Sequence, residues 1–429
     1  MPRLSRREDD RGSPGIGVTF LRKQESGSDT PASQRALRVL HVTPHYAPAW
    51  SYGGLVEAVF HLTRHLACAG ACVRVLTTDA NGEHRRLPPR ARAQYSGAFG
   101  VEAIYCARRA AKSVAPAMLA RLPAMVRWAD LVHLHAAYSF PSIPTLAAAR
   151  LAGRPVVWTP HGALQRWPGS RRVKLKSLWE KISGAIAPRR WTLHLTSRDE
   201  ARECADRFPN AARIIVPNGV EIPERAVRLE SADRLRIGFI GRLDPKKGIE
   251  NLLEACVLLA ERGRISFSLA IAGSGAPAYE RRLSVRVAAL SARIDVLMSG
   301  DVRDDAKERW FADRDVIVAP SFTENFGIVI AEALAREVPV IASHGTPWAE
   351  LETHGCGLWV ANDAASLAAA LERIAVMPRA AMGARGRAWM IDKFSWERCA
   401  RDMMRCYRDL LGRCDGPRES AIARAPGAL

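Results

Sequence analysis

The chain has 429 residues, of which 48% are hydrophobic and 25% charged, and a formal net charge of +19; this length predicts two domains of roughly 150 to 200 residues rather than one hydrophobic core. No apolar run reaches the length of about 18 residues that a membrane-spanning helix needs, and the first residues lack the apolar core of a signal peptide, so we expect a cytoplasmic protein. The nine cysteines include no CxxC pair and are odd in number, which favours reduced thiols.

The positive charge is concentrated in the first half of the chain. Residues 36–222 carry 26 lysine and arginine side chains against 11 acidic ones, whereas the residues before and after them add only +2 each. Such an asymmetry predicts that the first half faces a polyanion or an anionic membrane. A general bias toward arginine is the simpler alternative, but that bias would act on both halves alike.

The predicted elements begin after a polar segment. Residues 1–35 are rich in serine, glycine, proline and charge and lack apolar periodicity, so they predict a disordered tail. In residues 36–222, short apolar strands alternate with helices such as 53–70, a pattern that predicts a parallel sheet covered on both faces. The expected strands of this half lie at 37–44, 72–80, 129–135, 155–161, 191–197 and 212–220.

A polar stretch at 223–234 separates this half from a second one and predicts a linker. The alternation of strands and helices then restarts, so we expect a second Rossmann-like half with helices at 249–263 and 327–337. Its expected strands lie at 234–243, 266–275, 295–300, 315–321 and 339–343. Two such halves leave a cleft between them, and in open parallel sheets ligands bind where the strands end.

The segment GRLDPKKG follows the first strand of the second half. It places Arg242, Lys246 and Lys247 in a glycine-bounded loop at the end of that strand. A guanidinium and an ammonium group at this spacing can hold a diphosphate from two sides, the first by bidentate hydrogen bonds and the second as a point charge. An ordinary solvated loop is the alternative for this motif alone.

The segment PSFTENFGIVIAEALA, residues 320–335, carries two glutamates around the start of an apolar helix. The first free amides of that helix, near Gly327 and Ile328, favour an anion. Eight helical residues between Glu324 and Glu332 would span ~12 Å, more than the roughly 5 to 9.5 Å between paired hydrolytic carboxylates. We therefore expect two separate hydroxyl-binding roles along one extended ligand; the alternative for Glu332 is an ion pair with a structural arginine.

Five motifs in this order, VPNGV, GRLDPKKG, AIAGSG, SGDV and PSFTENFGIVIAEALA, resemble the retaining glycosyltransferases of family 4, which have the GT-B fold. The resemblance covers nearly all of residues 37–412. It implies two Rossmann-like domains facing a central cleft, with a nucleotide-sugar donor held chiefly by the second domain, residues 235–393. It also implies that catalysis uses no metal and no other cofactor.

The resemblance assigns roles to individual residues of the second domain. Arg242 and Lys247 would hold the diphosphate and Glu332 the ribose. The residues matched to the donor sugar are Glu324 and the backbone of Asn325, Phe326 and Gly327, and the further donor contacts are Val302 and Ile328.

The first domain, residues 36–222, would bind the acceptor. Gly53 and Gly54 follow its first strand, where the lack of a side chain permits close approach of the backbone to a phosphate or an acceptor. His161 in TPHG matches the family histidine that faces the transferred sugar and completes the implied catalytic set with Arg242, Lys247 and Glu324. We interpret His133 and His135 as structural.

The end of the chain resembles the family helix that crosses back to the first domain. This helix is expected at 394–413 and to be anchored by Phe394 and Trp396, and residues 414–429 are expected to form a second disordered tail.

Two basic stretches in the first half suggest a membrane. Residues 165–191 hold eight lysines or arginines and one glutamate, and residues 85–127 hold nine and one. Within the first stretch, one helical face aligns Leu175, Leu178, Trp179, Ile182 and Ile186. Such a helix suits an anionic membrane surface, with leucine and isoleucine serving the core and the basic side chains facing lipid; a helix packed wholly on its own domain is the alternative. Nucleic acid is not expected, because no nucleic-acid module is present.

Together these features predict a retaining glycosyltransferase that moves a hexose of mannose, glucose or galactose type from a nucleotide-diphosphate sugar to a saccharide acceptor. We expect a lipid-linked acceptor such as a polyprenyl-diphosphate oligosaccharide, at the inner face of the cell membrane, in cell-surface polysaccharide or lipopolysaccharide assembly. The competing class is a non-catalytic polyanion- or lipid-binding protein on a degenerate GT-B scaffold. The joint presence of four charged motif residues argues against this class: Arg242, Lys247, Glu324 and Glu332. A nicotinamide dehydrogenase would need GxGxxG after an early strand, which the sequence lacks.

Overall fold

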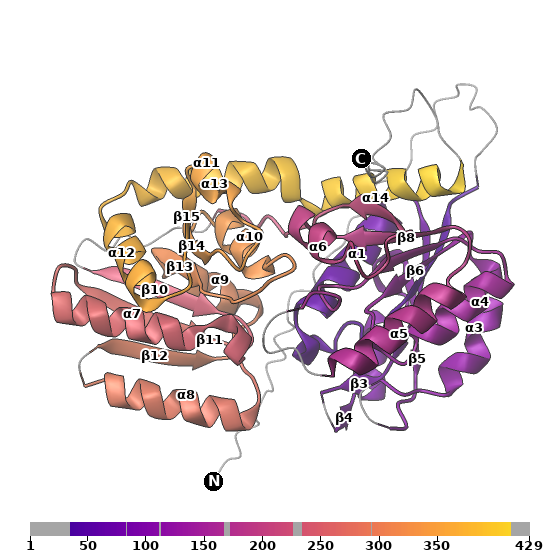
Figure 1. The fold of residues 1–429 in the computed structure, drawn as a ribbon, viewed down its shortest axis with the longest axis horizontal. Helices are drawn as coiled ribbons and strands as arrows, with labels where there is room; N and C mark the ends of the chain where they lie inside the picture. Colours follow the sequence, from indigo (N-terminus) through magenta and orange to yellow (C-terminus); the bar gives the residue numbers. More distant parts are fainter. Residues whose placement is uncertain are drawn as a thin grey trace, which may run out of the picture. The chain divides into compact units, whose positions relative to one another are not determined.

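The computed structural model describes residues 35–82, 84–110, 113–166, 172–225, 234–292 and 294–412. The predicted tails, apart from Arg35, and most of the predicted linker lie outside these residues. From Ala36 on, the described chain belongs to one compact unit that contains two parallel sheets (Figure 1). Within the described residues, no helix is both long and apolar enough to cross a membrane.

The first sheet has seven parallel strands in the order β5-β2-β1-β6-β7-β8-β9. The strands are β1 Arg38–Val42, β2 Cys72–Thr78, β5 Val101–Cys106, β6 Leu131–His135, β7 Val156–Thr159, β8 Trp191–Leu195 and β9 Ala212–Ile215. The helices of this half are η1 Trp50–Tyr52, α1 Gly54–Cys68, α2 Pro89–Tyr95, η2 Ala98–Gly100, α3 Ala117–Trp128, α4 Ser142–Leu151, α5 Val173–Ile186 and α6 Arg198–Glu203. A small antiparallel pair, β3 Ala80–Asn81 and β4 Arg85–Arg86, lies beside them.

The second sheet has six parallel strands in the order β12-β11-β10-β13-β14-β15. The strands are β10 Leu235–Ile240, β11 Phe267–Ala272, β12 Asp295–Gly300, β13 Val316–Ala319, β14 Val340–Ser343 and β15 Gly357–Val360. The helices are η3 Pro245–Lys247, α7 Ile249–Arg262, α8 Pro277–Leu290, α9 Asp304–Ala312, α10 Ile328–Ala335, α11 Glu350–Thr353, α12 Ala364–Ala375 and α13 Arg379–Phe394.

The central strands of both sheets are apolar because helices cover both faces, whereas the edge strands β9 and β12 are largely exposed. β10, for example, is buried along its whole length, as expected of a central parallel strand. Every strand predicted from the sequence is present. The strands that the prediction missed are β5 and β15, each at a sheet edge with one neighbouring strand, and the β3–β4 pair. The eight described cysteines form no disulfide, in agreement with the expected reduced thiols.

The last helix returns to the first half, as the resemblance implied. α13 packs on α10 of the second half, and α14, Trp396–Leu411, packs on α1 of the first half (Figure 1). At the junction, Phe394 contacts the rings of Phe326 and Trp348 in the second half. Trp396 instead lies in the core of the first half, together with Tyr407. The predicted fold class is therefore confirmed.

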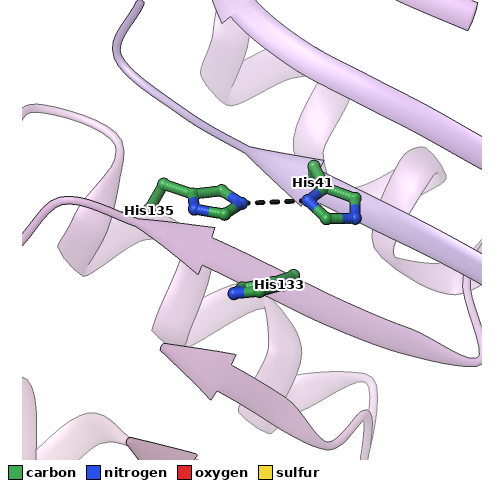
Figure 2. A group of neighbouring side chains, drawn as sticks. All are labelled: His41, His133 and His135. Atoms are coloured by element: carbon green, nitrogen blue, oxygen red, sulfur yellow. Dashed lines mark hydrogen bonds between the residues drawn. The ribbon is translucent and has the colours of Figure 1, made fainter. Parts of the chain in front are cut away.

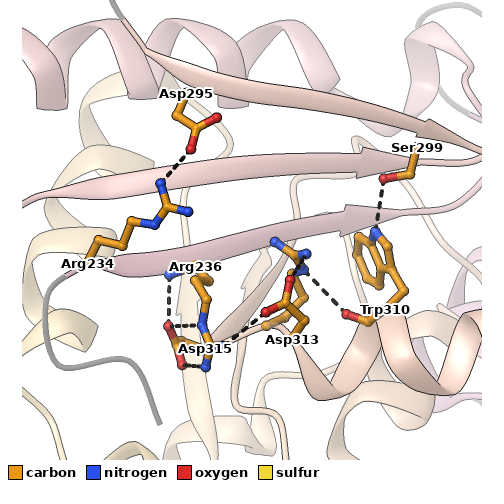
Figure 3. Close-up of polar contacts among 8 residues, drawn as sticks. Arg234, Arg236, Asp295, Ser299, Trp310, Asp313 and Asp315 are labelled. Carbon is orange, nitrogen blue, oxygen red and sulfur yellow. Dashed lines mark hydrogen bonds and ion pairs between the residues drawn. The ribbon is translucent and has the colours of Figure 1, made fainter. Parts of the chain in front are cut away.

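Both strand orders reverse at a central point, between β1 and β6 in the first sheet and between β10 and β13 in the second. An ion-pair cluster fixes the second of these points (Figure 3). The backbone N–H of Arg236 on β10 donates to Asp315 Oδ2 at 2.8 Å, and its Nη2 donates to Oδ1 at 2.9 Å. Burial raises the pKa of Asp315, but the hydrogen bonds and charge of Arg236 outweigh burial and lower it. This bidentate pair holds together the two strands whose far ends carry the predicted ligand-binding loops.

Candidate active site

One cleft of about 1040 Å³ is lined by residues of both halves. It contains every site residue predicted from the sequence, namely Gly53, Gly54, His161, Arg242, Lys247, Val302, Glu324, Asn325, Phe326, Gly327, Ile328 and Glu332. These residues come from the carboxyl ends of β1, β7, β10, β12 and β13 and from α10. Because parallel strands end at one edge of a sheet, residues far apart in sequence meet there.

Glu324 has protein partners in the cleft. Lys247 Nζ donates to its Oε1, and Ser321 Oγ donates to the same oxygen at 2.8 Å. Burial raises the pKa of Glu324, but the charges of Lys247 and Lys246 outweigh burial and hold the pKa below its ordinary value. Glu324 is therefore ionised at neutral pH, and Lys247 lies where it can contact both this carboxylate and a bound anion.

Glu332 also has a lysine partner. Its Oε1 accepts from Lys307 Nζ at 2.6 Å. The sequence suggested an arginine as the alternative partner, but Arg336 donates to the backbone oxygen of Glu332 instead, at 3.0 Å. Glu332 lines the cleft, so its carboxylate group lies beside the space where a ligand would bind.

The two halves touch at the glycines that follow β1. Arg242 Nη2 donates to the backbone oxygen of Tyr52 at 2.9 Å. Gly53 has a φ of +68°, and a Cβ on it would lie 3.3 Å from Arg242 Nη2. A side chain here would be strained and would crowd the guanidinium. In this structure it is therefore the Arg242 side chain that approaches the backbone at Gly53. The neighbouring Gly54 faces Ile328.

His161 lies in a turn after β7 that a buried carboxylate supports. The backbone N–H of Gly162 donates to Glu200 Oε1 at 2.7 Å, and that of Thr196 donates to Oε2 at 2.8 Å. Thr196 Oγ1 donates to the backbone oxygen of Asn325 at 3.0 Å, which links this turn to the second half. Burial raises the pKa of Glu200.

Glu200 was not predicted as part of the site, although its sequence context held a signal. It stands three residues after the N-cap Ser197, in the spacing of a capping box, and its backbone N–H donates to Ser197 Oγ at 3.1 Å. The capping pattern identifies the helix start but not the contact with Gly162.

A chain of hydrogen bonds crosses the first sheet from α14. His194 Nε2 lies 2.8 Å from the backbone oxygen of Val216, so this nitrogen carries the proton and Nδ1 accepts from Thr159 Oγ1 at 2.8 Å. Thr159 must then accept from His133 Nε2 at 2.6 Å, and His133 Nδ1 accepts from Tyr407 Oη at 2.5 Å. One carbonyl oxygen therefore determines the direction of the whole chain.

A second chain of imidazoles leads to the cleft. His135 Nε2 lies 2.9 Å from His41 Nδ1 (Figure 2), and His135 Nδ1 lies 3.0 Å from His161 Nε2. His41 Nε2 is buried and has no hydrogen-bond partner among the described residues. Because a buried N–H without an acceptor is rarer than a buried acceptor without a donor, His41 Nδ1 carries the proton and each ring donates toward His161. His161 thus accepts at Nε2 and presents a protonated Nδ1.

These histidines are neutral. Burial lowers the pKa of His41 and of His161 to about 3, and it lowers those of His133 and His135 well below the ordinary value. His41, His133 and His135 are close enough to share a metal ion. Five of their six ring nitrogens are already hydrogen-bonded, however. The interpretation of His133 and His135 as structural agrees with this arrangement.

Helix α5 is oriented differently from the prediction. Its inward side carries Glu180 and Ser183, both buried, and Trp179, whose Nε1 donates to the backbone oxygen of Ala137 at 3.0 Å. Glu180 accepts hydrogen bonds from Arg166 and Tyr138. The outward side exposes the apolar side chains of Val173, Leu175, Leu178 and Ile182. The expectation that leucine and isoleucine serve the core holds only for Ile186, which packs against it, and is wrong for the other three.

Comparison with known proteins places both halves among sugar-transferring enzymes. Residues 52–223 match the model for Glycosyltransferase Family 4, and residues 221–389 match that for Glycosyl transferases group 1. The chain is 28% identical over 420 residues to a D-inositol 3-phosphate glycosyltransferase of Frankia alni, covering 87% of this chain and 98% of that protein. It is 30% identical over 297 residues to a phosphatidyl-myo-inositol mannosyltransferase of Mycobacterium leprae, covering 65% and 73%. The crystal structure of Anabaena Alr3699/HepE in complex with UDP and glucose superposes with a TM-score of 0.68 at 17% identity, covering 87% of this chain and 100% of that one.

Proposed function

The chain belongs to the group 1 glycosyl transferases of family 4 and has their GT-B fold, and from this premise we propose that it transfers a hexose, with retention of configuration, from a nucleotide-diphosphate sugar to a lipid-linked saccharide acceptor. That the chain is a glycosyltransferase follows from the family. The donor, the acceptor and the stereochemistry are the proposal. It rests on one observation: His161 of the first half and Arg242, Lys247 and Glu324 of the second line the same cleft.

In this proposal Arg242 and Lys247 hold the diphosphate. Their charges neutralise the charge that grows on the leaving phosphate as the bond to the sugar C1 breaks, so transfer needs no catalytic metal. Lys247 bridges the phosphate and Glu324, and the ionised carboxylate of Glu324 accepts hydrogen bonds from sugar hydroxyls. Glu332, paired with Lys307, accepts from the ribose hydroxyls.

The remaining donor contacts come from the loop before α10 and from the first half. The backbone of Asn325, Phe326 and Gly327 contacts the sugar, and Val302 and Ile328 line the same space. His161 donates from Nδ1 to a sugar oxygen, because Nε2 is occupied by His135. The acceptor oxygen forms its bond to C1 on the face from which the phosphate departs, and the acceptor proton passes to that phosphate.

The acceptor side faces a membrane in this proposal. The exposed apolar side chains Val173, Leu175, Leu178 and Ile182 lie on α5 among basic residues, a combination that suits anionic lipid. The named acceptors of two relatives, inositol 3-phosphate and phosphatidyl-myo-inositol, carry phosphate, and the second is a lipid. We therefore place the enzyme at the inner face of the cell membrane, in cell-surface polysaccharide or lipopolysaccharide assembly, with lipid rather than nucleic acid as the partner of its basic half.

A thermal-shift screen against a panel of nucleotide-diphosphate sugars in EDTA tests the donor site. We expect at least one donor to raise the melting temperature of the wild-type protein and of Lys393→Ala, which removes an exposed lysine on α13. The same donor should have a much smaller effect on Lys247→Ala. Equal stabilisation of Lys247→Ala, or no stabilisation by any donor, would contradict the proposed site, whereas a strict need for Mg²⁺ would contradict only the metal-free part.

A further inference from the structure

Two histidines and a glutamate gather where the chain passes between the two halves. His61 and His65 stand four residues apart on α1, so both side chains lie on one helical face. Glu221 follows β9, and its Oε1 lies 2.7 Å from His61 Nδ1. One donor atom from each of His61, His65 and Glu221 lies within 4.8 Å of the others.

The hydrogen bonding of His65 leaves a free lone pair. His65 Nδ1 lies 2.7 Å from the backbone oxygen of His61 and must donate to it. Nε2 is therefore unprotonated in the neutral ring, which is the form that binds a metal ion. It lies 3.5 Å from Oε1 of Glu397, the second residue of α14. This separation is too long for a hydrogen bond, but it is close to the ~3.4 Å between two ligands that each lie about 2.1 Å from a tetrahedral zinc ion.

His61 is also incompletely satisfied. Its buried Nδ1 makes no aligned hydrogen bond to another described residue, despite its contact with Glu221. Its other ring nitrogen, Nε2, lies 3.6 Å from Oε2 of Glu57. A small shift would let Nε2–H donate a hydrogen bond to that carboxylate and leave Nδ1 free for a cation. The half-exposed Glu221 has room to move by the fraction of an ångström that shared coordination requires.

The charges around the two imidazoles favour a cation. The carboxylates of Glu57, Glu221 and Glu397 surround them, and the neighbouring cation among the residues that contact this group is Arg64, 3.6 Å from Glu221. Burial lowers the pKa of His61, but the hydrogen bonds and charges of Glu221 and Glu57 outweigh burial and raise it. A metal ion bound at this ring would therefore take the place of a proton.

We propose that His61, His65 and Glu221 bind a divalent transition-metal ion, with zinc as the best match, and that Glu397 completes the coordination. Nitrogen and carboxylate ligands in a set of four suit zinc. The proposed ligands are distinct from Arg242, Lys247 and Glu324, although His61 and Glu221 line the same cleft, so the ion is proposed as a structural one at the edge of the transfer site.

The position of the site suggests what the ion does. Val220, beside Glu221, donates its backbone N–H to the oxygen of Phe394 at 2.7 Å, so both passages of the chain between the halves lie side by side here. The rings of His61 and Trp396 stack at 5.5 Å. An ion bound to α1, Glu221 and Glu397 would tie both passages to the first half and so restrain movement of one half relative to the other. This proposal does not depend on the proposed donor or acceptor.

Metal titration of the EDTA-stripped full-length protein tests the proposal. We expect one Zn²⁺ per chain by isothermal calorimetry, a tetrahedral Co²⁺ absorption spectrum, and a zinc-dependent rise in melting temperature. Glu221→Gln keeps the shape of an exposed side chain and should weaken zinc binding by more than about tenfold, as should His65→Gln. His344→Gln, in the second half, should bind like the wild type.

Each outcome bears on the proposal directly. If Glu221→Gln and His65→Gln both bind zinc as tightly as the wild type, the ion occupies another place and the proposal is wrong. Absence of saturable binding to the wild type also overturns it. Because His65 is buried, circular dichroism must show that His65→Gln is folded; if it is not, Glu221→Gln decides alone.

Discussion

At the scale of single residues, the buried histidines of the first half form two chains of hydrogen bonds, each with a fixed donor-to-acceptor direction. Tyr407 of α14 is the first donor of one chain, and His161 accepts the last hydrogen bond of the other. Both chains depend on rings held neutral by burial. The orientation of His161 toward the cleft therefore depends on residues of β1 and β6.

Tyr407→Phe tests the chain that begins on α14. Without the hydroxyl group, His133 Nδ1 is a buried acceptor with no donor, which should lower the free energy of unfolding by about 1 to 3 kcal/mol in urea denaturation. Tyr95→Phe is the control, since its hydroxyl makes no hydrogen bond to another described residue. Equal stability of the two variants would mean that the Tyr407–His133 contact contributes nothing.

The site residues that stand together in short sequence motifs could be predicted, whereas their partners from distant parts of the chain could not. Arg242, Lys247 and Glu324 stand in short motifs directly after strands, so their meeting could be predicted from strand order. The partners that complete the site could not be predicted. Lys307 lies 25 residues from Glu332, and Glu200 lies 38 residues from Gly162, and only the packing of α9 and α6 brings them together.

At the scale of elements, α5 shows how an apolar stripe can mislead. Periodicity alone cannot tell whether a stripe faces the core or a partner. Here the polar residue Glu180 is buried because Arg166 and Tyr138 satisfy it, and Leu175 and Leu178 are exposed. Two of the missed strands, β5 and β15, have a different cause. Edge strands are covered less completely, so their apolar pattern is weaker or shorter.

The exposed face of α5 predicts membrane binding. Leu175→Ser with Leu178→Ser should reduce co-sedimentation with vesicles containing phosphatidylglycerol. Transfer of each leucine side chain from water into the membrane contributes about 1.5 to 3 kcal/mol of binding free energy, and the double variant loses both contributions. Val285→Ser with Leu297→Ser removes similarly exposed side chains from the second half and should have no effect. If co-sedimentation of the wild type depends neither on the anionic lipid content of the vesicles nor on the salt concentration, the basic residues make no electrostatic contribution.

At the scale of the whole molecule, the two sheets and the returning helix followed from the alternation of strands and helices together with the family motifs. The hydrophobic core of the first half, on which α14 packs, should make the stability of the protein depend on pH. His41, His133, His135, His161 and His194 are buried there with lowered pKa values.

These histidines predict acid lability. Below the ordinary pKa of about 6.5 the unfolded chain binds protons that the folded chain does not, so stability is complete above that pH and is lost as the pH falls toward the lowered folded values. Each such histidine contributes up to about 1.4 kcal/mol per pH unit. The urea midpoint should therefore be nearly constant above about pH 7.5 and should fall progressively as the pH is lowered from about 7 to about 5.5. If the urea midpoint does not decrease when the pH is lowered below the ordinary histidine pKa, these rings are not buried in the neutral form.

We propose that the cleft transfers sugar from a nucleotide donor with retention of configuration. Proton NMR of the first product formed in EDTA tests this proposal, because the anomeric coupling identifies the configuration before mutarotation. We expect the released or transferred hexose to keep the anomeric configuration of the donor, and we expect Lys247→Ala to abolish its formation while Lys393→Ala does not. An inverted product, or no turnover of any donor by the wild-type protein with acceptor present, would contradict it.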